Sequence, residues 1–333
     1  MDSLTQIVLG AAVGEAVLGR KVGNKAMLYG AIAGTIPDLD IVAKYFTDTV
    51  TAIELHRGIS HSIFFAILMS PLFGWLVWKI NSKANATWRD WSWLFFWGLF
   101  THPILDAFTT WGTQLFWPID LRLAFQNIFV IDPLYTLPFL FFLILTSFQQ
   151  RTSAKRRRYN RLGLIISSSY LVLTMVLKGV AHRSFTNSLE AQGIAYTDID
   201  VRPTPLNTIL WTANIDTEDA YLIGNYSFFD TKEIDFEAYP KNHQFLGDLK
   251  NEDKVKRLIA ISEGWYTIYK REGGLYFNDL RFGLISLDPK ETEFTFSYLL
   301  LKNDGKLMVE ETPKFRKDAE RLLSLLWDRV WGN

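Results

Sequence analysis

The chain has 333 residues, with 35 basic and 35 acidic side chains, no cysteine and 49% hydrophobic residues. The balanced charge gives no basic surplus for a typical nucleic-acid-binding protein, and the lack of cysteine excludes disulfides, thiolate metal ligands and a cysteine nucleophile. A mean hydropathy of +0.07 is too high for a disordered chain and too low for a protein lying wholly in a membrane. A chain of this length is expected to form about two domains.

The charges are distributed unevenly along the chain. Residues 1–180 hold 16 Lys/Arg and 10 Asp/Glu, whereas residues 181–333 hold 19 and 25. The first part is therefore poor in charge, while the second has the composition of an ordinary soluble domain. We predict a transmembrane domain over residues 1–180, followed by a soluble domain over residues 181–333.

Six apolar stretches in the first part predict an α-helical membrane bundle of about six helices. Two shorter stretches, 4–18 and 26–36, precede four that are long enough to span a bilayer: 62–80, 91–108, 131–148 and 162–177. The short stretches carry glycines four residues apart, at Gly10 and Gly14 and at Gly30 and Gly34. This spacing is typical of two helices that approach closely in lipid, although small residues also occur in any packed helix pair.

Basic residues cluster in alternate loops of this bundle. The clusters are Arg20, Lys21 and Lys25; Lys79, Lys83 and Arg89; and Arg151, Lys155, Arg156, Arg157, Arg158 and Arg161. Loops rich in Lys and Arg stay on the cytoplasmic side. We therefore predict a multi-pass protein of a bacterial-type inner (cytoplasmic) membrane, with both termini and the C-terminal domain extracytoplasmic.

The second part reads as a β-rich α+β domain. Strands are expected at 207–213, 221–229, 265–270, 275–284, 293–301 and 306–310, with hairpin connections at 272–274 and 303–305. Asn251 is a candidate cap for a short helix that follows it. Residues 315–331 repeat apolar residues at helical spacing. This amphipathic helix either closes the core of the domain, which we favour, or lies on a membrane surface.

Three polar clusters interrupt the apolar first part. They are Pro37-Asp38-Leu39-Asp40, His56-Arg57-Gly58-Ile59-Ser60-His61-Ser62 and His102-Pro103-Ile104-Leu105-Asp106. Ionisable residues at membrane depth are costly and indicate function. With alternating helices, all three clusters fall on the same extracytoplasmic side.

The spacing within each cluster limits what it can do. His102 and Asp106 share one helix face, which suits two ligands of one metal or a buried hydrogen bond. His56 and His61 are five residues apart and cannot chelate from one helix. Ser60 is a candidate N-cap, which would put His61 in the first helical turn and leave His56 in the loop. Asp38 and Asp40 alone are more typical of solvated turn residues.

Taken together, the clusters gather three imidazoles and three carboxylates. This donor set suits one or two divalent ions, with zinc preferred and iron or manganese as alternatives. Such an ion generates a nucleophile from water or clamps the oxygens of a phosphoester. The residues alone leave open a structural metal site and a non-enzymatic membrane protein that binds or transports metal ions. A transporter would need polar groups that continue across the membrane, where Glu15 is the clear candidate.

These motifs, together with Met1-Asp2-Ser3-Leu4-Thr5-Gln6 and Gly112-Thr113-Gln114-Leu115-Phe116-Trp117-Pro118, resemble the YdjM-like family of membrane-bound metal-dependent hydrolases over about the first 180 residues. The resemblance implies that Asp38, Asp40, His56, His61, His102 and Asp106 ligate metal. A distant relationship of the family to zinc-dependent phospholipase C implies phosphoester hydrolysis. Many members have a histidine where this chain has Gln6, which is a weaker candidate ligand.

Arg57 lies between the two histidines and is the candidate catalytic residue outside the ligand set. It either binds the anionic group of a substrate or extends its guanidinium to lipid headgroups. A site at the membrane interface favours an amphiphilic substrate, such as a phospholipid or a lipid-linked molecule. The sequence thus predicts a membrane metal-dependent hydrolase.

Overall fold

The structure, a computed structural model, describes residues 1–333 except 289, 304–305 and 314–317, and it divides into two compact units. The first unit comprises Met1–Ala43, Leu55–Leu177 and Pro205–Asn207. The second comprises Lys44–Glu54, Lys178–Thr204 and Thr208–Asn333. One boundary between the units lies between Leu177 and Lys178, within a single long helix. The second unit also includes Lys44–Glu54, which precedes His56 in the chain.

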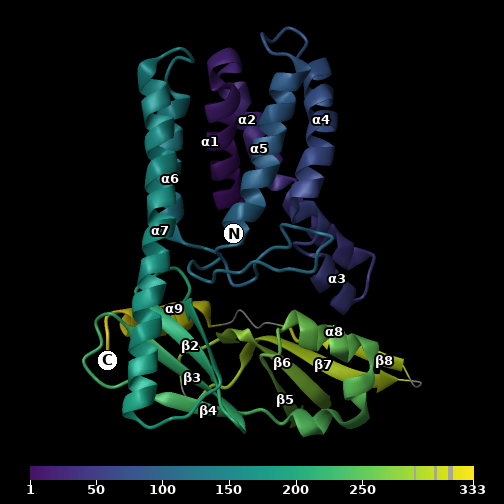
Figure 1. The fold of residues 1–333 in the computed structure, drawn as a ribbon, viewed down its shortest axis with the longest axis vertical. Helices are drawn as coiled ribbons and strands as arrows, with labels where there is room; N and C mark the ends of the chain where they lie inside the picture. The colour runs from purple at the N-terminus through teal and green to yellow at the C-terminus, as the bar shows by residue number, and fades with distance from the viewer. Residues whose placement is uncertain (289, 304–305, 314–317) are drawn as a thin grey trace. The chain divides into compact units, whose positions relative to one another are not determined.

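The first unit is a bundle of helices that run side by side (Figure 1). Its long helices are α1 (Ser3–Val22), α2 (Asn24–Thr35), α4 (Ile63–Ile80), α5 (Trp88–Asp106), α6 (Pro133–Ser147) and the first part of α7 (Ala154–Ala191). Two 3₁₀ helices, η1 (Pro37–Tyr45) and η2 (Ile59–His61), lie between α2 and α4 in the chain. Each of the six predicted apolar stretches overlaps one of the long helices.

By length and composition, fewer helices qualify as membrane spans than the roughly six helices expected in the bundle. Two helices, α4 and α7, are long and apolar enough to cross a membrane. A third span results if α2 and η1, which meet at a bend of 42°, count as one. Helix α6 has 15 residues, and α5 includes Arg89, Asp90, His102 and Asp106. The described residues therefore support two or three spans by length and composition.

The glycines of α1 and α2 pack these two helices backbone to backbone. A Cβ atom on Gly30 would lie 2.2 Å from the carbonyl oxygen of Gly10. One on Gly14 would lie 2.3 Å from the carbonyl oxygen of Ala26. No side chain fits at such distances, so the spacing noted in the sequence does produce the close helix approach.

The three basic loops meet at one end of the first unit. Lys21 forms an ion pair with Asp90, and Arg151 donates a hydrogen bond to the Lys21 carbonyl oxygen. Lys25 donates to Asn81. These contacts join the α1–α2, α4–α5 and α6–α7 connections, as the alternation of the loops requires.

The second unit contains two four-stranded antiparallel sheets, each in the strand order of the sequence. The first comprises β1 (Asp198–Pro203), β2 (Leu210–Asp216), β3 (Ala220–Ser227) and β4 (Phe236–Pro240). The second comprises β5 (Tyr266–Arg271), β6 (Gly274–Leu284), β7 (Phe294–Asn303) and β8 (Lys306–Glu311). The six predicted strands overlap β2, β3 and β5–β8, while β1 and β4 were not predicted. Part of the expected 303–305 connection lies outside the described residues.

Short helices complete the second unit. They are α3 (Thr49–Leu55), η3 (His243–Asn251), α8 (Asp253–Ile261) and α9 (Ala319–Val330). Val50 of α3 joins the core formed by α8 and the second sheet, and Arg257 of α8 pairs with Glu54. The N-cap position of α8 is Glu252, so the expected cap at Asn251 was wrong.

The C-terminal helix α9 is attached to the first sheet mainly by its last turn. Its Val330 is buried and accepts a hydrogen bond from the Ser227 hydroxyl, and Arg329 pairs with Asp230. Leu323 and Trp327 remain 51% and 62% exposed. The start of the predicted helix, residues 315–317, lies outside the described residues.

Candidate metal centre

Four side chains from three segments of the first unit converge on one point. Asp38 comes from η1, His61 from η2, and His102 and Asp106 from the last turns of α5. One potential ligand atom of each lies within 4.8 Å of those of the other three. His61, His102 and Asp106 are buried, whereas the Asp38 side chain is 23% exposed. Asp38 is therefore the member of the cluster whose side chain is partly exposed.

The distances between the ligand atoms match those around a small divalent ion. The Nε2 atoms of His61 and His102 are 3.1 Å apart. Their distances to the nearest carboxylate oxygens are 3.5 and 3.4 Å for Asp38 and 3.4 and 3.6 Å for Asp106. Four ligands bound tetrahedrally at zinc distances stand about 3.3 Å from one another. The donor set and its spacing therefore fit such an ion.

The hydrogen bonds of His102 fix which of its nitrogens faces the cluster. Its Nδ1 lies 2.6 Å from the carbonyl oxygen of Gly34, at the end of α2. A carbonyl oxygen only accepts, so Nδ1 carries the proton and donates it. In the neutral ring Nε2 then has a free lone pair directed at the other three residues, which is the arrangement of a metal-binding histidine.

Asp40 orients the second histidine in the same way. Its carboxylate lies 3.3 Å from Nδ1 of His61 and accepts a hydrogen bond from Ser60, whose hydroxyl also contacts His61 Nδ1. Hydrogen bonding at Nδ1 leaves Nε2 for the cluster. Ser60 therefore acts beside His61 in the 3₁₀ turn, and Ser62, rather than Ser60, caps α4. The expected cap at Ser60 was wrong by two residues.

His56 forms its ion pair with Asp40, and its ring lies edge-on to that of His61, with the ring centroids 6.2 Å apart. Its Nδ1 is 2.9 Å from Asp40 Oδ1, and its side chain is 23% exposed. Asp40 also accepts the backbone N–H of Arg57 at 2.8 Å. The six residues expected as ligands thus divide into the group Asp38, His61, His102 and Asp106 and the adjoining pair of Asp40 and His56.

Three buried polar atoms beside Asp106 have no hydrogen-bond partner. They are Asp106 Oδ2, Arg57 Nε and Gln6 Oε1. Arg57 Nε lies 3.2 Å from Asp106 Oδ2 without the alignment of a hydrogen bond. Buried polar atoms left unpaired cost free energy. An acceptor oxygen unpaired among imidazole nitrogens is what a site for a cation requires.

Gln6 lies against Asp106 and outside the four clustered residues. Its amide nitrogen donates to Asp106 Oδ1 at 2.9 Å and to the His102 carbonyl oxygen at 3.3 Å. The amino group of Met1 also contacts Asp106 Oδ1. Asp106 is therefore held by donors on one oxygen, while its other oxygen faces the histidines. The contact with Met1 was not anticipated from the sequence.

Arg57 is buried and directed into the protein. Its side chain is 4% exposed, which does not fit a guanidinium extended to lipid headgroups. Its Nη1 donates to Thr109 at 2.9 Å, and its φ of 62° is a left-handed conformation that is strained for a residue with a side chain. A strained backbone conformation of this kind persists only where contacts with the surrounding structure fix it.

The irregular segment after α5 supplies that support. The backbone N–H of Gln114 donates to the Arg57 carbonyl oxygen, and the Thr113 hydroxyl donates to the His61 carbonyl oxygen. Ile63 donates to the carbonyl oxygen of Leu115. This segment has no periodic pattern in the sequence, so its contacts with the histidine loop could not be predicted.

The carboxylates around His61 predict that metal binding depends on pH. Burial lowers the pKa of His61, but the nearby carboxylates of Asp106, Asp38 and Asp40 favour the protonated ring, outweigh burial and raise the pKa to about 9. A proton therefore competes with the cation at neutral pH. We expect metal affinity to rise about tenfold per pH unit below pH 9 and then to level off. Competition with a chromogenic chelator measures this slope; an affinity independent of pH would show that His61 gives up no proton.

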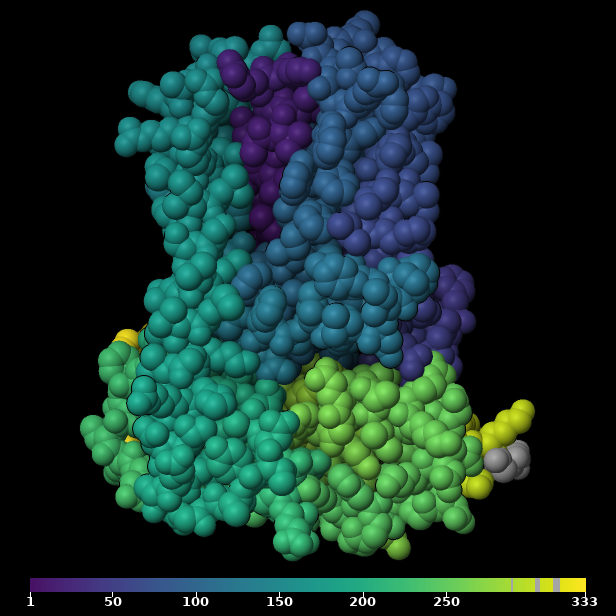
Figure 2. Space-filling model, in the orientation of Figure 1, coloured from purple at the N-terminus to yellow at the C-terminus, as the bar shows by residue number. Residues whose placement is uncertain are grey.

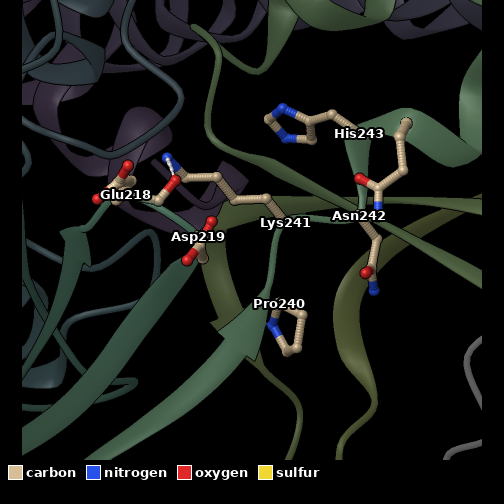
Figure 3. A pocket seen from close by; sticks show the side chains of 7 residues that line it. Glu218, Asp219, Pro240, Lys241, Asn242 and His243 are labelled. Atoms are coloured by element: carbon tan, nitrogen blue, oxygen red, sulfur yellow. Dashed lines mark hydrogen bonds between the residues drawn. The ribbon is translucent and has the colours of Figure 1, made fainter.

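A hollow in the second unit differs from the metal cluster because its Lys and His side chains already have partners within the protein (Figure 3). It has a volume of about 410 Å³ and lies where β3 begins and β4 ends. Its Lys241 is paired with Asp216 at 2.7 Å and donates to the Glu218 carbonyl oxygen. His243 stacks on Tyr266 and bonds the Tyr266 carbonyl oxygen, and burial lowers its pKa. This histidine has a structural role, as its isolation in the sequence suggests.

Comparison with known proteins identifies a family. The model of the YdjM inner membrane protein family matches residues 1–186, more than half of the chain, including every residue of the candidate metal centre. None of the curated proteins and none of the solved structures matches significantly. The apolar helices and this match identify a membrane protein: the chain belongs to the YdjM inner membrane protein family.

Proposed function

We propose that this protein is a membrane-embedded metal-dependent hydrolase that cleaves phosphoesters. The observation that carries the proposal is the convergence of two histidine Nε2 atoms, 3.1 Å apart, with carboxylate oxygens of Asp38 and Asp106 that lie 3.4–3.6 Å from them. This spacing favours zinc, with iron and manganese as alternatives. When bound, the ion supplies Lewis-acid chemistry: it makes water nucleophilic at neutral pH and neutralises charge on a phosphoester oxygen.

The neighbouring residues have the chemistry that such a reaction needs. Asp38 is the ligand that solvent reaches, so substrate and water approach from its side. His56 is partly exposed and held by Asp40, an arrangement that suits a group which takes up and releases a proton. Arg57 places a buried cation beside Asp106, with its Nε 3.2 Å from Asp106 Oδ2, and a guanidinium suits the binding of an anionic substrate group.

Metal transport is the second candidate, and the other end of the bundle gives it little support. Transport would require polar groups that continue from the cluster across the membrane. The deep carboxylate expected for that purpose, Glu15, is paired with Arg156 at 2.6 Å through both oxygens. A carboxylate neutralised in this way is a poor ligand for a passing cation, so we favour hydrolysis.

The proposal includes an orientation. The contacts among the basic loops gather them at one end of the first unit, and the positive-inside rule assigns that end to the cytoplasm. The metal cluster lies at the other ends of the helices concerned, and hence on the outer side of the inner membrane. The same assignment makes the C-terminal domain extracytoplasmic.

The test is hydrolysis by the detergent-purified protein loaded with zinc, manganese or iron, using bis(p-nitrophenyl) phosphate and phospholipids as probes. We expect activity in the wild type and none in H102A prepared in parallel. R57K should retain the metal but lose about 10- to 100-fold in kcat/KM, because an ammonium cannot replace the planar guanidinium fork. Metal-loaded wild type that is no more active than H102A on any of these probes would refute the proposal.

A further inference from the structure

An apolar groove in the first unit is lined in part by residues that directly follow Asp38, Gly34 and Gln6 in the chain. It has a volume of about 310 Å³ and is formed by α1, α2 and the start of η1, with Ile7, Leu28, Ile32, Ile36 and Leu39 among its lining residues. Its polar lining group is the Thr35 hydroxyl, which donates to the Ala31 carbonyl oxygen. The groove therefore offers apolar contact and no free hydrogen-bonding group.

Three lining residues each directly follow, in the chain, a residue that belongs to the metal cluster or contacts it. Ile7 follows Gln6, whose amide contacts Asp106. Thr35 follows Gly34, whose carbonyl oxygen holds His102. Leu39 follows Asp38 directly. Leu39 belongs to η1, which meets α2 at a bend of 42°. One end of the groove is thus built from the immediate neighbours of the metal-cluster residues.

The other end of the groove lies farther along α2. From Ile36 back to Leu28 is eight residues of helix, or about 12 Å, which is a useful length for an extended hydrocarbon chain. Leu28, Ile32 and Leu39 are 57%, 43% and 59% exposed, so the groove is open on its outer side. Figure 2 shows α1 only partly covered by the neighbouring helices on the face in view. A lipid chain entering from the bilayer would exchange one apolar environment for another.

We propose that this groove binds an acyl chain of a phospholipid from the surrounding membrane and so presents the lipid phosphoester to the metal cluster. This proposal rests on the proposed function and names the substrate class of the hydrolase. The substrate is an amphiphile whose apolar part lies along the groove and whose anionic part lies beside Asp38 and Arg57. The polarity of the protein changes in the same order, from apolar at Leu28 to charged at Asp38. A free phosphate ester without an acyl chain would gain nothing from the groove.

The test is photo-crosslinking of the full chain in vesicles of phosphatidylethanolamine and phosphatidylglycerol that contain phosphatidylglycerol with a diazirine on its acyl chain. Mass spectrometry then compares labelling of residues 24–39 with labelling of α4. Helix α4 exposes Phe64, Ile67 and Leu68 and reports ordinary contact with bulk lipid. We expect the groove segment to be labelled about tenfold more, because the groove packs against a bound chain on several sides and holds it longer than a passing lipid.

Two matched substitutions separate the groove from the general lipid surface. I32W fills the groove and should reduce its labelling to the level of α4. I67W makes the same change on exposed α4 and should leave the labelling of the groove unchanged. Equal labelling of both segments in the wild type, or undiminished labelling in I32W, would overturn the proposal, because the groove would then be ordinary lipid-facing surface.

Labelling tests whether the groove binds an acyl chain, and hydrolysis tests whether the protein is an enzyme, so the two hypotheses can fail separately. Labelling does not require turnover, so H102A should be labelled in the groove like the wild type. Groove labelling without hydrolysis by any metal-loaded sample would leave a lipid-binding site and remove the hydrolase. Hydrolysis of bis(p-nitrophenyl) phosphate without preferential labelling would leave the hydrolase and remove the acyl groove.

Discussion

Replacing His102 by alanine is expected to remove the bound metal ion. The substitution deletes one of four ligand atoms and leaves Asp106, which is buried, without the imidazole that faces its free oxygen. Loss of a residue that merely orients a ligand costs about 10- to 100-fold in metal affinity, so loss of a ligand should cost more. Mass-spectrometric metal analysis of detergent-purified protein measures the effect, with near-stoichiometric metal expected in the wild type.

His56 provides the matched control because it is also a histidine of the same motif. It contacts Asp40 and lies outside the four-residue cluster, so H56A should retain its metal. D40N should fall between the two, with affinity lowered about 10- to 100-fold through the weakened orientation of His61. Metal loss in H56A as complete as in H102A would show that the pair belongs to the ligand set. A wild type without metal, with its helices intact, would reduce the cluster to a hydrogen-bond network.

Much of this cluster is predictable from the sequence, for an identifiable physical reason. Ionisable side chains are rare in apolar helices, so Asp38, His61, His102 and Asp106 stand out without any structure. Their convergence also follows from the alternation of the helices. The division into two groups does not follow, because it depends on the 3₁₀ turn at His61 and on the Asp40 carboxylate, which contacts His61 and His56 together.

The contacts that support the cluster, such as the hydrogen bond between Gly34 and His102, cannot be predicted from the sequence for a different reason. The Gly34 carbonyl oxygen is a backbone atom, and every residue but proline has the same backbone groups, so nothing in the sequence marks it as the partner of His102. Arg57 could be assigned to the site or to lipid headgroups with equal justification. Only its burial and its contact with Thr109 distinguish the two.

Hydrophobic periodicity also predicts part of the fold, whereas the length of α7 and the existence of β1 depend on tertiary contacts. The apolar stretch 162–177 predicts one span, but α7 continues to Ala191, because Ala181, Phe185 and Leu189 are buried in the second unit. Strand β1 contains Asp198, Asp200 and Arg202, and its charges hide its strand character. Arg202 is buried and bonded to Asp200 and Asn214, which is visible only once the sheet has formed.

Replacing Arg156 by methionine is expected to destabilise the first unit by about 3–5 kcal/mol, the cost of leaving a buried charge without its partner. Arg156 and Glu15 are 2% and 4% exposed and form two hydrogen bonds of 2.6 Å. The pair joins α7 to α1. Arg156 also donates to the Gln149 carbonyl oxygen at 2.8 Å. The free energy of unfolding in detergent, measured by denaturant titration, gives the size of the effect.

Two further variants show whether the pair, rather than the positive charge, is responsible. R158M removes the same charge from an exposed position two residues away on α7 and should change the free energy of unfolding by less than about 0.5 kcal/mol. The double variant Glu15→Leu with Arg156→Met removes both charges and should be more stable than R156M alone, since no buried charge remains unpaired. If R156M and R158M lose the same stability, the packing of α7 on α1 does not depend on this ion pair. In that case Glu15 would again be available as the deep carboxylate that a metal transporter requires, and metal transport would become as well supported as hydrolysis.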